Sequence, residues 1–267
     1  MTESKDFQSR VIAHAAELLT ESRYVVGLTG AGVSVESGIP PFRGPGGLWT
    51  KLGEPSMNGY EKFLEDPKGY WERRLAPDTS QNDLSESLKS AKPNLSHYAL
   101  VELEALEVLK CLITQNIDNL HREVGHKALA EIHGNKNLLR CIECNARYAP
   151  EEIPLEKLPP RCRHCKGIIK GDVVGFGEPI PSDVLQVCQQ ESARADCMII
   201  AGTSATVYPA AAFPQLIKQR GGILIEVNLY ESELTRICDV SLRGKSGEIL
   251  PLLVAQVREL KAKGVTR

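Results

Sequence analysis

The chain has 267 residues, with 32 Lys and Arg against 34 Asp and Glu for a net charge of −2, 42% hydrophobic residues and 5% aromatic residues. This composition is that of an ordinary globular protein, and the length suits one large domain of about 150 residues or more with inserts. Without an excess of cations the chain lacks the bulk charge that draws proteins to nucleic acids or anionic membranes, so we expect neither partner. The N-terminal residues match no signal or transit peptide and no stretch is long and apolar enough to span a membrane, so we expect a cytoplasmic protein.

Alternating helix and strand patterns run through most of the chain. The spacing of apolar residues predicts an amphipathic helix over residues 7–22, and a buried strand over 24–29 follows it. The same alternation predicts helices over 95–107, 182–193 and 208–220, each followed by a strand, over 108–114, 197–201 and 222–227, with a closing helix over 249–262. Strands separated by helices of about 10–15 residues predict an α/β fold, a Rossmann-like parallel sheet with helices on both faces.

Two segments interrupt this alternation and are interpreted as inserts. Residues 45–93 are rich in Gly, Pro, Asn and Ser and suggest a small helical insert, while residues 134–172 contain a cluster of cysteines. We therefore predict a Rossmann-like domain made of residues 1–44, 94–133 and 173–267, with a helical insert over 45–93 and a zinc-binding module over 134–172.

The cysteine cluster has the spacing of a metal site. Two C-x-x-C pairs, Cys141 with Cys144 and Cys162 with Cys165, stand 17 residues apart. Four thiolates complete a tetrahedral Zn²⁺ shell with no open position, so we predict one structural zinc ribbon with four cysteine ligands. Free thiols or a redox pair are weaker alternatives, because a redox motif places one C-x-x-C at a helix start. The other cysteines, at positions 111, 188, 197 and 238, are expected in the core.

A glycine-rich turn follows the first predicted strand. Gly30 and Gly32 allow a tight turn whose backbone N–H groups approach a pyrophosphate, although the spacing does not match the G-x-G-x-x-G fingerprint and a plain glycine turn stays an alternative. Polar residues also follow two later strands, with Gly202, Thr203 and Ser204 at one and Asn228 at the other. Ligands of such sheets bind at the carboxyl ends of the strands, so these ends favour a nucleotide.

Taken in order, these motifs resemble one family. GAGVSVESGIPPFRG at 30–44, TQNID at 114–118, HG at 133–134, the two C-x-x-C pairs, VVGFGE at 173–178, GTS at 202–204 and VN at 227–228 resemble the sirtuins, which are NAD-dependent protein-lysine deacylases. The resemblance implies a Rossmann-like domain carrying a helical module and a zinc module. It also implies that NAD is a co-substrate, and that the products are nicotinamide, O-acyl-ADP-ribose and free lysine.

The resemblance assigns roles to matching residues. His133 corresponds to the catalytic base, which takes a proton from a ribose hydroxyl, and Asn116 and Asp118 orient nicotinamide and water. Val174, Phe176, Gly177 and Glu178 lie in the segment that binds an acyl-lysine protein or peptide as an added strand. The residues implied in NAD binding are Gly30, Ala31, Gly32, Phe42, Arg43, Gln115, Asn116, Ile117, Asp118, Gly202, Thr203, Ser204 and Asn228.

Two residues of the helical insert predict which acyl groups the enzyme removes. Tyr70 and Arg73 resemble the Tyr-x-x-Arg pair with which class III sirtuins bind the carboxylate of succinyl- or malonyl-lysine, and residues three apart share one face of a helix. We therefore expect removal of acetyl and also of succinyl or malonyl groups. Val35 departs from this class, which has Ala there, and Gly175 stands where a larger residue is common.

Three alternatives accompany this interpretation. The enzyme would act as a deacetylase only, or it would transfer ADP-ribose to another nucleophile from the same NAD site. A third alternative is a zinc-ribbon interaction protein that senses NAD without turnover. The oligomeric state is open, with a monomer favoured, and the residues near adenine are expected around 243–248.

Overall fold

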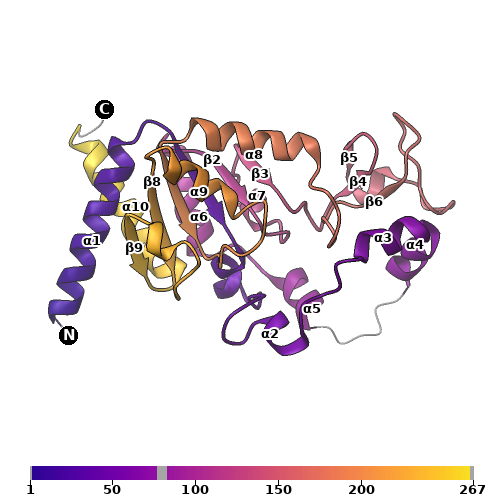
Figure 1. The fold of residues 1–267 in the computed structure, drawn as a ribbon, viewed down its shortest axis with the longest axis horizontal. Coiled ribbons are helices and arrows are strands. Elements are labelled where there is room, and N and C mark those ends of the chain that lie inside the picture. Colours follow the sequence, from indigo (N-terminus) through magenta and orange to yellow (C-terminus); the bar gives the residue numbers. More distant parts are fainter. Residues whose placement is uncertain (1, 77–82, 265–267) are drawn as a thin grey trace.

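The structure, a computed structural model, describes residues 2–76 and 83–264 (Figure 1). A six-stranded sheet forms its centre, in the order β3-β2-β1-β7-β8-β9, and all neighbouring strands in it are parallel. Its strands are β1 (Val25–Thr29), β2 (Leu109–Thr114), β3 (Leu129–Glu131), β7 (Cys197–Ala201), β8 (Ile223–Asn228) and β9 (Val240–Arg243). The chain runs outward from β1 on one side and from β7 on the other, so the strand order reverses between these two strands, where such sheets bind ligands.

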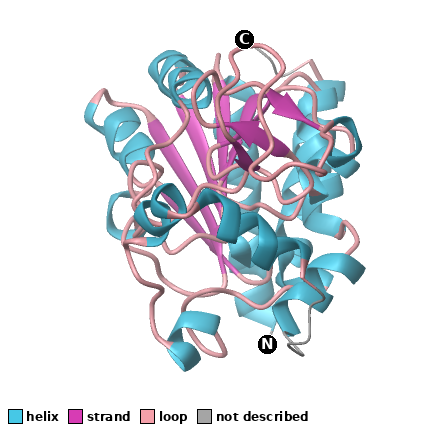
Figure 2. Cartoon of the chain, turned by 90° about the vertical axis from the view of Figure 1, so that its right-hand side faces the viewer, coloured by secondary structure: helices cyan, strands magenta, loops and turns pink. Residues whose placement is uncertain are grey.

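Helices cover both faces of this sheet (Figure 2). They are α1 (Thr2–Glu21), α6 (Leu95–Ala105), α7 (Leu120–Glu123), α8 (Ser182–Arg194), α9 (Ala212–Gln219) and α10 (Ser246–Ala262), with short 3-10 helices η1 (Ala31–Ser37) and η3 (Thr235–Ile237). None of the helices in the described ranges is long and apolar enough to cross a membrane.

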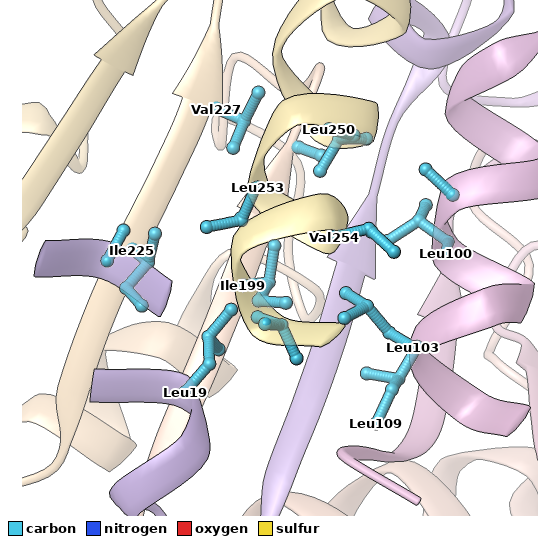
Figure 3. Close-up of a cluster of buried hydrophobic side chains, with 14 of the residues drawn as sticks. Leu19, Leu100, Leu103, Leu109, Ile199, Ile225, Val227, Leu250, Leu253 and Val254 are labelled. Carbon is cyan, nitrogen blue, oxygen red and sulfur yellow. The ribbon is translucent and has the colours of Figure 1, made fainter. Parts of the chain in front are cut away.

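One buried cluster joins α1, α6 and α10 to the sheet. Leu250, Leu253 and Val254 of α10 point toward strand side chains and toward Leu19 of α1 and Leu103 of α6 (Figure 3). A second cluster packs α8 and α9 on the opposite face, with Phe213 and Ile217 against strand side chains. The strands are therefore buried on both faces, which explains their nearly continuous apolar sequences.

The first insert contains α2 (Leu48–Leu52), α3 (Gly59–Glu65), α4 (Pro67–Leu75) and α5 (Asp83–Ser90). Its helices α3 and α4 lie beside the second insert, at the end of the molecule away from the termini (Figure 1). The second forms an antiparallel sheet in the order β5-β4-β6, made of β4 (Leu139–Cys141), β5 (Arg147–Tyr148) and β6 (Ile169–Gly171), with η2 (Pro150–Glu152). Trp71 of α4 is 1% exposed and its indole N–H donates to the Ile169 carbonyl at 2.7 Å, so the inserts are packed against each other.

The predicted parallel sheet is confirmed, with differences in its elements. The predicted helix over 208–220 extends only from Ala212 to Gln219, and Tyr208 is excluded because Pro209 disfavours helical backbone in the residue before it. The predicted helix over 95–107 ends at Ala105, and Glu107 has a left-handed φ of 58°. The short strands β3 and β9 were not predicted, since three or four residues carry too little periodicity.

Candidate functional site

The turn after β1 lies against the turn after β7 at the carboxyl edge of the sheet. Gly32 N–H donates to the Gly202 carbonyl at 2.7 Å, and a Cβ on Gly32 would stand 2.6 Å from the Gly202 Cα. Gly202 has a φ of +61°, and its own Cβ would meet the Val33 nitrogen at 2.4 Å. The two glycines thus allow two backbones to touch at the point of strand reversal. Ala31 lies half-buried between Gly30 and Gly32.

A buried hydrogen-bond network follows β2. The Asn116 side-chain amide donates to the Gly30 carbonyl and to Ser34 Oγ, both at 3.1 Å. Ser34 Oγ donates to Asp118 Oδ2 at 2.7 Å, and the other oxygen of Asp118 accepts from Leu120 N–H at 2.9 Å. Asn116 and Asp118 are 7% and 4% exposed. The network holds η1 against the loop after β2, which fixes both side chains that the sequence singled out.

The ends of β7 and β8 join the same edge. Gln115 donates its side-chain N–H to Thr203 Oγ1 at 2.9 Å, and Asn228 donates to the Thr203 carbonyl at 2.9 Å. Ser204 Oγ lies 3.1 Å from the Thr206 hydroxyl. The segment after β9 also reaches this edge, where Gly244 N–H donates to the Asn228 carbonyl at 3.2 Å. The structure therefore brings polar residues from the ends of β2, β7 and β8 together with the backbone that follows β9, at the edge where such sheets bind nucleotides.

His133 follows β3 at this edge and is poised as a base. Its Nδ1 lies 3.1 Å from the Gln115 carbonyl oxygen, which only accepts hydrogen bonds, so Nδ1 carries the proton and Nε2 keeps a lone pair. Burial lowers the pKa of His133 below its ordinary value, against the opposing effect of the Gln115 carbonyl. The imidazole is therefore neutral and basic at neutral pH.

Aromatic packing connects a residue expected to bind NAD, Phe42, with a residue expected to bind the peptide, Phe176. Phe42 and Phe176 both pack on Trp49, with ring centroids 4.8 Å and 5.5 Å away. The Arg43 guanidinium lies 4.4 Å from the same ring and pairs with Glu54 at 2.8 Å. Arg43, expected at NAD, thus has protein partners in this structure.

The segment 173–178 runs beside His133. Val174 N–H donates to the His133 carbonyl at 2.9 Å, and the Phe176 carbonyl accepts from Tyr60 N–H at 3.1 Å. Gly177 is exposed and has a φ of +78°. These bonds hold the segment between the large sheet and the helical insert.

Glu178 has a different place from the one expected. Its carboxylate is 2% exposed and pairs with Arg140 and, at 3.0 Å, with Lys170, whose side chains are 3% and 5% exposed. It also accepts Gly175 N–H at 2.7 Å. Glu178 is therefore an internal ion-pair partner that anchors the segment to the zinc module and not a free substrate contact.

Tyr70 and Arg73 have separate partners. The Tyr70 hydroxyl accepts Gly171 N–H of β6 at 3.2 Å, whereas the Arg73 guanidinium is 68% exposed and lies 3.5 Å from Asp66. Val35, the departure noted above, is 42% exposed in η1. In this structure the phenol and the guanidinium therefore have different partners, and the guanidinium is open to solvent.

The four cysteine sulfurs converge as the spacing predicts. All lie within 4.8 Å of one another, and the Sγ pairs Cys141–Cys165 and Cys144–Cys162 are 3.4 Å and 3.6 Å apart. A tetrahedral ion with Zn–S bonds of about 2.3 Å requires sulfur separations of about 3.8 Å, so the cluster fits Zn²⁺. His164 is exposed and outside the cluster. Of the other cysteines, those at 111, 188 and 197 are buried, and Cys238 is partly exposed.

Sequence reasoning missed several residues that build the site. Ser34 links Asn116 to Asp118, and Asn94 donates to the Val33 carbonyl and to Ser37 Oγ, both at 2.8 Å, fixing η1 against α6. Asn94 carries a signal, since an N-cap residue before an apolar helix is recognisable. Ser34 stands in the motif at 30–44, but nothing local in the sequence indicates its bonds to Asn116 and Asp118, because these partners come from a distant segment. Ile117, which was expected at NAD, is half-buried, and its carbonyl accepts from Lys136 N–H at 2.9 Å.

Comparisons with known proteins agree over most of the chain. The sequence pattern of the Sir2 family matches residues 30–209. "NAD-dependent protein deacylase 1" of Archaeoglobus fulgidus is 45% identical over 243 residues, which are 90% of this chain and 96% of that protein. "NAD-dependent protein deacylase" of Thermococcus kodakarensis is 41% identical over 259 residues, which are 95% of this chain and 98% of that protein.

Solved structures of Sir2 proteins are also similar to this chain over most of its length. A Sir2 homologue in complex with NAD has a TM-score of 0.74 at 44% identity, over 92% of this chain and 93% of that one. A Sir2 structure with a p53 peptide and NAD⁺ has a TM-score of 0.70 at 34% identity, over 95% of this chain and 98% of that one.

Proposed function

The chain belongs to the Sir2 family, and from this premise we propose how its residues carry out NAD-dependent protein-lysine deacylation. NAD is the co-substrate: acyl-lysine, NAD and one water molecule are consumed, the ADP-ribose accepts the acyl group, and nicotinamide and free lysine are released. The four cysteines hold one structural Zn²⁺, whose closed thiolate shell takes no part in the reaction.

The observation that carries the proposal is the state of His133. Its Nδ1–H is held by the Gln115 carbonyl at 3.1 Å, and burial keeps the ring neutral, so Nε2 is the free base. We assign to Nε2 the removal of a proton from a ribose hydroxyl, which makes that oxygen a nucleophile toward the acyl carbon.

The remaining site residues bind and orient NAD. Asn116 and Asp118 are proposed to face the nicotinamide side, where their buried positions give fixed dipoles in a low-dielectric site. Proximity at the carboxyl edge of the sheet supports a cofactor role for Gly30, Ala31, Gly32, Gln115, Ile117, Gly202, Thr203, Ser204 and Asn228. Phe42 and Arg43, which pack on Trp49, are proposed to bind NAD on the family resemblance alone.

The peptide is proposed to add as a strand along residues 173–178, where backbone pairing gives affinity with little demand on sequence. Val174, Phe176 and Gly177 supply this segment, and Glu178 fixes it from behind through Arg140 and Lys170. The bond from Val174 N–H to the His133 carbonyl supports an acyl-lysine entering beside the base.

The domain boundaries predicted above are retained as a proposal: residues 1–44, 94–133 and 173–267 bind NAD, 45–93 form the helical insert and 134–172 the zinc module. We further propose that the enzyme works in the cytoplasm, because a four-thiolate zinc centre suits a reducing compartment.

A comparison of two histidine variants tests the reaction. The wild type with acetyl-lysine peptide and NAD is expected to yield free lysine, nicotinamide and O-acetyl-ADP-ribose by mass spectrometry. His133→Ala is expected to abolish these products while keeping the wild-type circular dichroism spectrum, and His14→Ala, an exposed histidine of α1, to keep full turnover. Near-full turnover by His133→Ala contradicts the assignment, ADP-ribose on another nucleophile indicates a transferase, and NAD binding without nicotinamide release indicates a sensor.

The acyl range is tested by a panel of acetyl-, succinyl- and malonyl-lysine peptides. We propose that Tyr70 and Arg73 bind the carboxylate of a succinyl or malonyl group, because the Arg73 guanidinium is 68% exposed and its contact with Asp66 at 3.5 Å is a solvent-screened pair. Arg73→Met is then expected to lose desuccinylation and to keep deacetylation. An equal effect on both activities contradicts this role.

A further inference from the structure

Three histidines that the reaction does not use are buried together beneath the carboxyl ends of β1 and β2. His97 of α6, His121 of α7 and His126 before β3 are 0%, 2% and 7% exposed. The ring centroid of His121 lies 4.7 Å from that of His97 and 5.4 Å from that of His126. The three rings therefore form one contiguous buried cluster.

One nitrogen of each ring lacks a partner. His97 Nε2, His121 Nδ1 and His126 Nε2 are buried and make no hydrogen bond to any described part of the chain. A buried polar group without a hydrogen bond is costly, so these three nitrogens, which belong to neighbouring rings, call for a partner.

The second nitrogen of His97 and of His126 fixes the tautomer. Asn94 N–H donates to His97 Nδ1 at 3.2 Å, so the proton of that neutral ring is on Nε2. His126 Nδ1 bonds the Glu104 carboxylate, whose oxygens also accept two backbone N–H groups, and these bonds lower the pKa of Glu104 against the opposing effect of burial. A carboxylate only accepts, so His126 carries its proton on Nδ1 and has a lone pair at Nε2.

The hydroxyl of Thr29 fixes the tautomer of the third ring, that of His121. Thr29 donates to Thr114 Oγ1 at 2.9 Å and lies 3.1 Å from His121 Nε2, so Nε2 carries the proton and donates to Thr29. His121 Nδ1 then has a lone pair. The cluster presents one N–H donor and two acceptors, which is the complement of one water molecule that accepts once and donates twice.

A metal ion does not fit the same nitrogens. A metal ligand needs a lone pair, and the unpartnered nitrogen of His97 carries a proton. Among the described residues, only the four cysteines bring their ligand atoms close enough together to hold a metal ion. Burial lowers the pKa of all three histidines, that of His97 to about 4, which keeps the rings neutral as the donor count requires.

We propose that His97, His121 and His126 bind one internal water molecule, and that His121 is thereby a positioning residue for the NAD site. The chain of contacts is short: His121 donates to Thr29, Thr29 donates to Thr114, and Thr114 Oγ1 accepts Asn116 N–H at 3.1 Å. The water fixes the His121 ring from the side opposite Thr29, and Thr114 then fixes the backbone that carries Asn116. The positioning role rests on the proposed NAD-binding role of Asn116, whereas the water site does not.

The water site is tested on the full zinc-loaded protein without NAD. A high-resolution crystal structure is expected to show one peak within about 2.7–3.2 Å of all three nitrogens. Long-range ¹H–¹⁵N correlation spectra are expected to show protons on His97 Nε2, His121 Nε2 and His126 Nδ1. A dry cluster with direct bonds between rings, an anomalous signal from a metal, or a proton on His97 Nδ1 each overturns the proposal, and none of these readouts depends on enzyme activity.

The positioning role is tested by NAD affinity, measured calorimetrically. His121→Phe is expected to weaken NAD binding about tenfold, the size of one lost hydrogen bond, and His121→Asn, which keeps an N–H donor, to restore part of it. His14→Phe on the exposed face of α1 is the matched control, with unchanged affinity. If His121→Phe fails to fold, Thr29→Val interrupts the same chain and is expected to show the same loss. Wild-type affinity in a folded His121→Phe or Thr29→Val overturns the positioning role, while absence of NAD binding by the wild type overturns the proposed function instead.

Discussion

The buried ion pairs behind residues 173–178 give a prediction whose size follows from the structure. Glu178 contacts Arg140 and Lys170, and all three side chains are at most 5% exposed. In Glu178→Gln the side chain keeps its shape and an acceptor for Gly175 N–H but loses its charge. Lys170 then keeps the carbonyls of Gly171 and Val173, at 2.8 Å and 2.7 Å, as hydrogen-bond acceptors, but it loses the carboxylate that neutralises it.

Removing one partner of a buried ion pair costs about 3–5 kcal/mol, because the remaining charge stays desolvated. Arg140 retains Asp172, with its Nε 3.1 Å from Oδ1, so we expect the lower end, about 3 kcal/mol. The matched control is Glu152→Gln, which breaks the pair with Arg163, where the side chains are 48% and 52% exposed. Solvent screens such a pair, so its loss is expected to destabilise the protein far less than the loss of the buried pair.

The assay is urea denaturation at neutral pH in zinc-buffered solution, with the free energy of unfolding compared among the wild type and both variants. A double variant, Glu178→Gln with Lys170→Met, removes the stranded charge and is expected to recover part of the loss. If Glu178→Gln is no more destabilising than Glu152→Gln, or if the double variant shows the simple sum of both losses, the ion pair does not anchor this segment.

Three further predictions concern the turn after β1, the zinc ion and the stability of the protein at low pH. Gly32→Ala places a Cβ 2.6 Å from the Gly202 Cα, so we expect a loss of about 1–3 kcal/mol in unfolding free energy and weaker NAD binding by calorimetry; wild-type values for both would contradict the close contact. Removal of zinc by a chelator is expected to unfold β4–β6 and to expose Trp71, so that its fluorescence shifts to longer wavelength, and an unchanged spectrum would show that the module folds without metal. The pKa of His97 is lowered to about 4 by burial from an unfolded value of about 6.5, so its contribution to stability is complete above about pH 6.5 and declines as the pH falls toward about 4. Urea midpoints across this range are expected to fall less steeply in His97→Gln than in the wild type, and an identical slope would refute the assignment.

Local patterns in the sequence were sufficient to predict the parallel sheet and the zinc centre. Apolar runs separated by amphipathic helices predicted four of the six strands of the large sheet nearly to the residue, because a strand buried on both faces must be continuously apolar. The two C-x-x-C pairs predicted the converging sulfurs, because ligands in one knuckle are fixed by a few bonds of chain. His133 was identified by resemblance, and its tautomer came from the Gln115 carbonyl, 18 residues away.

The partners of side chains far apart in sequence were decided by tertiary structure alone. The sequence by itself determined the order of elements, the metal ligands and the residue types at the strand ends, since these depend on periodicity and short spacing. It did not determine that Glu178 turns inward to Arg140 and Lys170, or that Tyr70 and Arg73 have different partners. It also gave no sign that three histidines from separate segments meet with one donor and two acceptors. Such contacts depend on how packed elements approach in space, and burial then makes each hydrogen bond or charge pair obligatory.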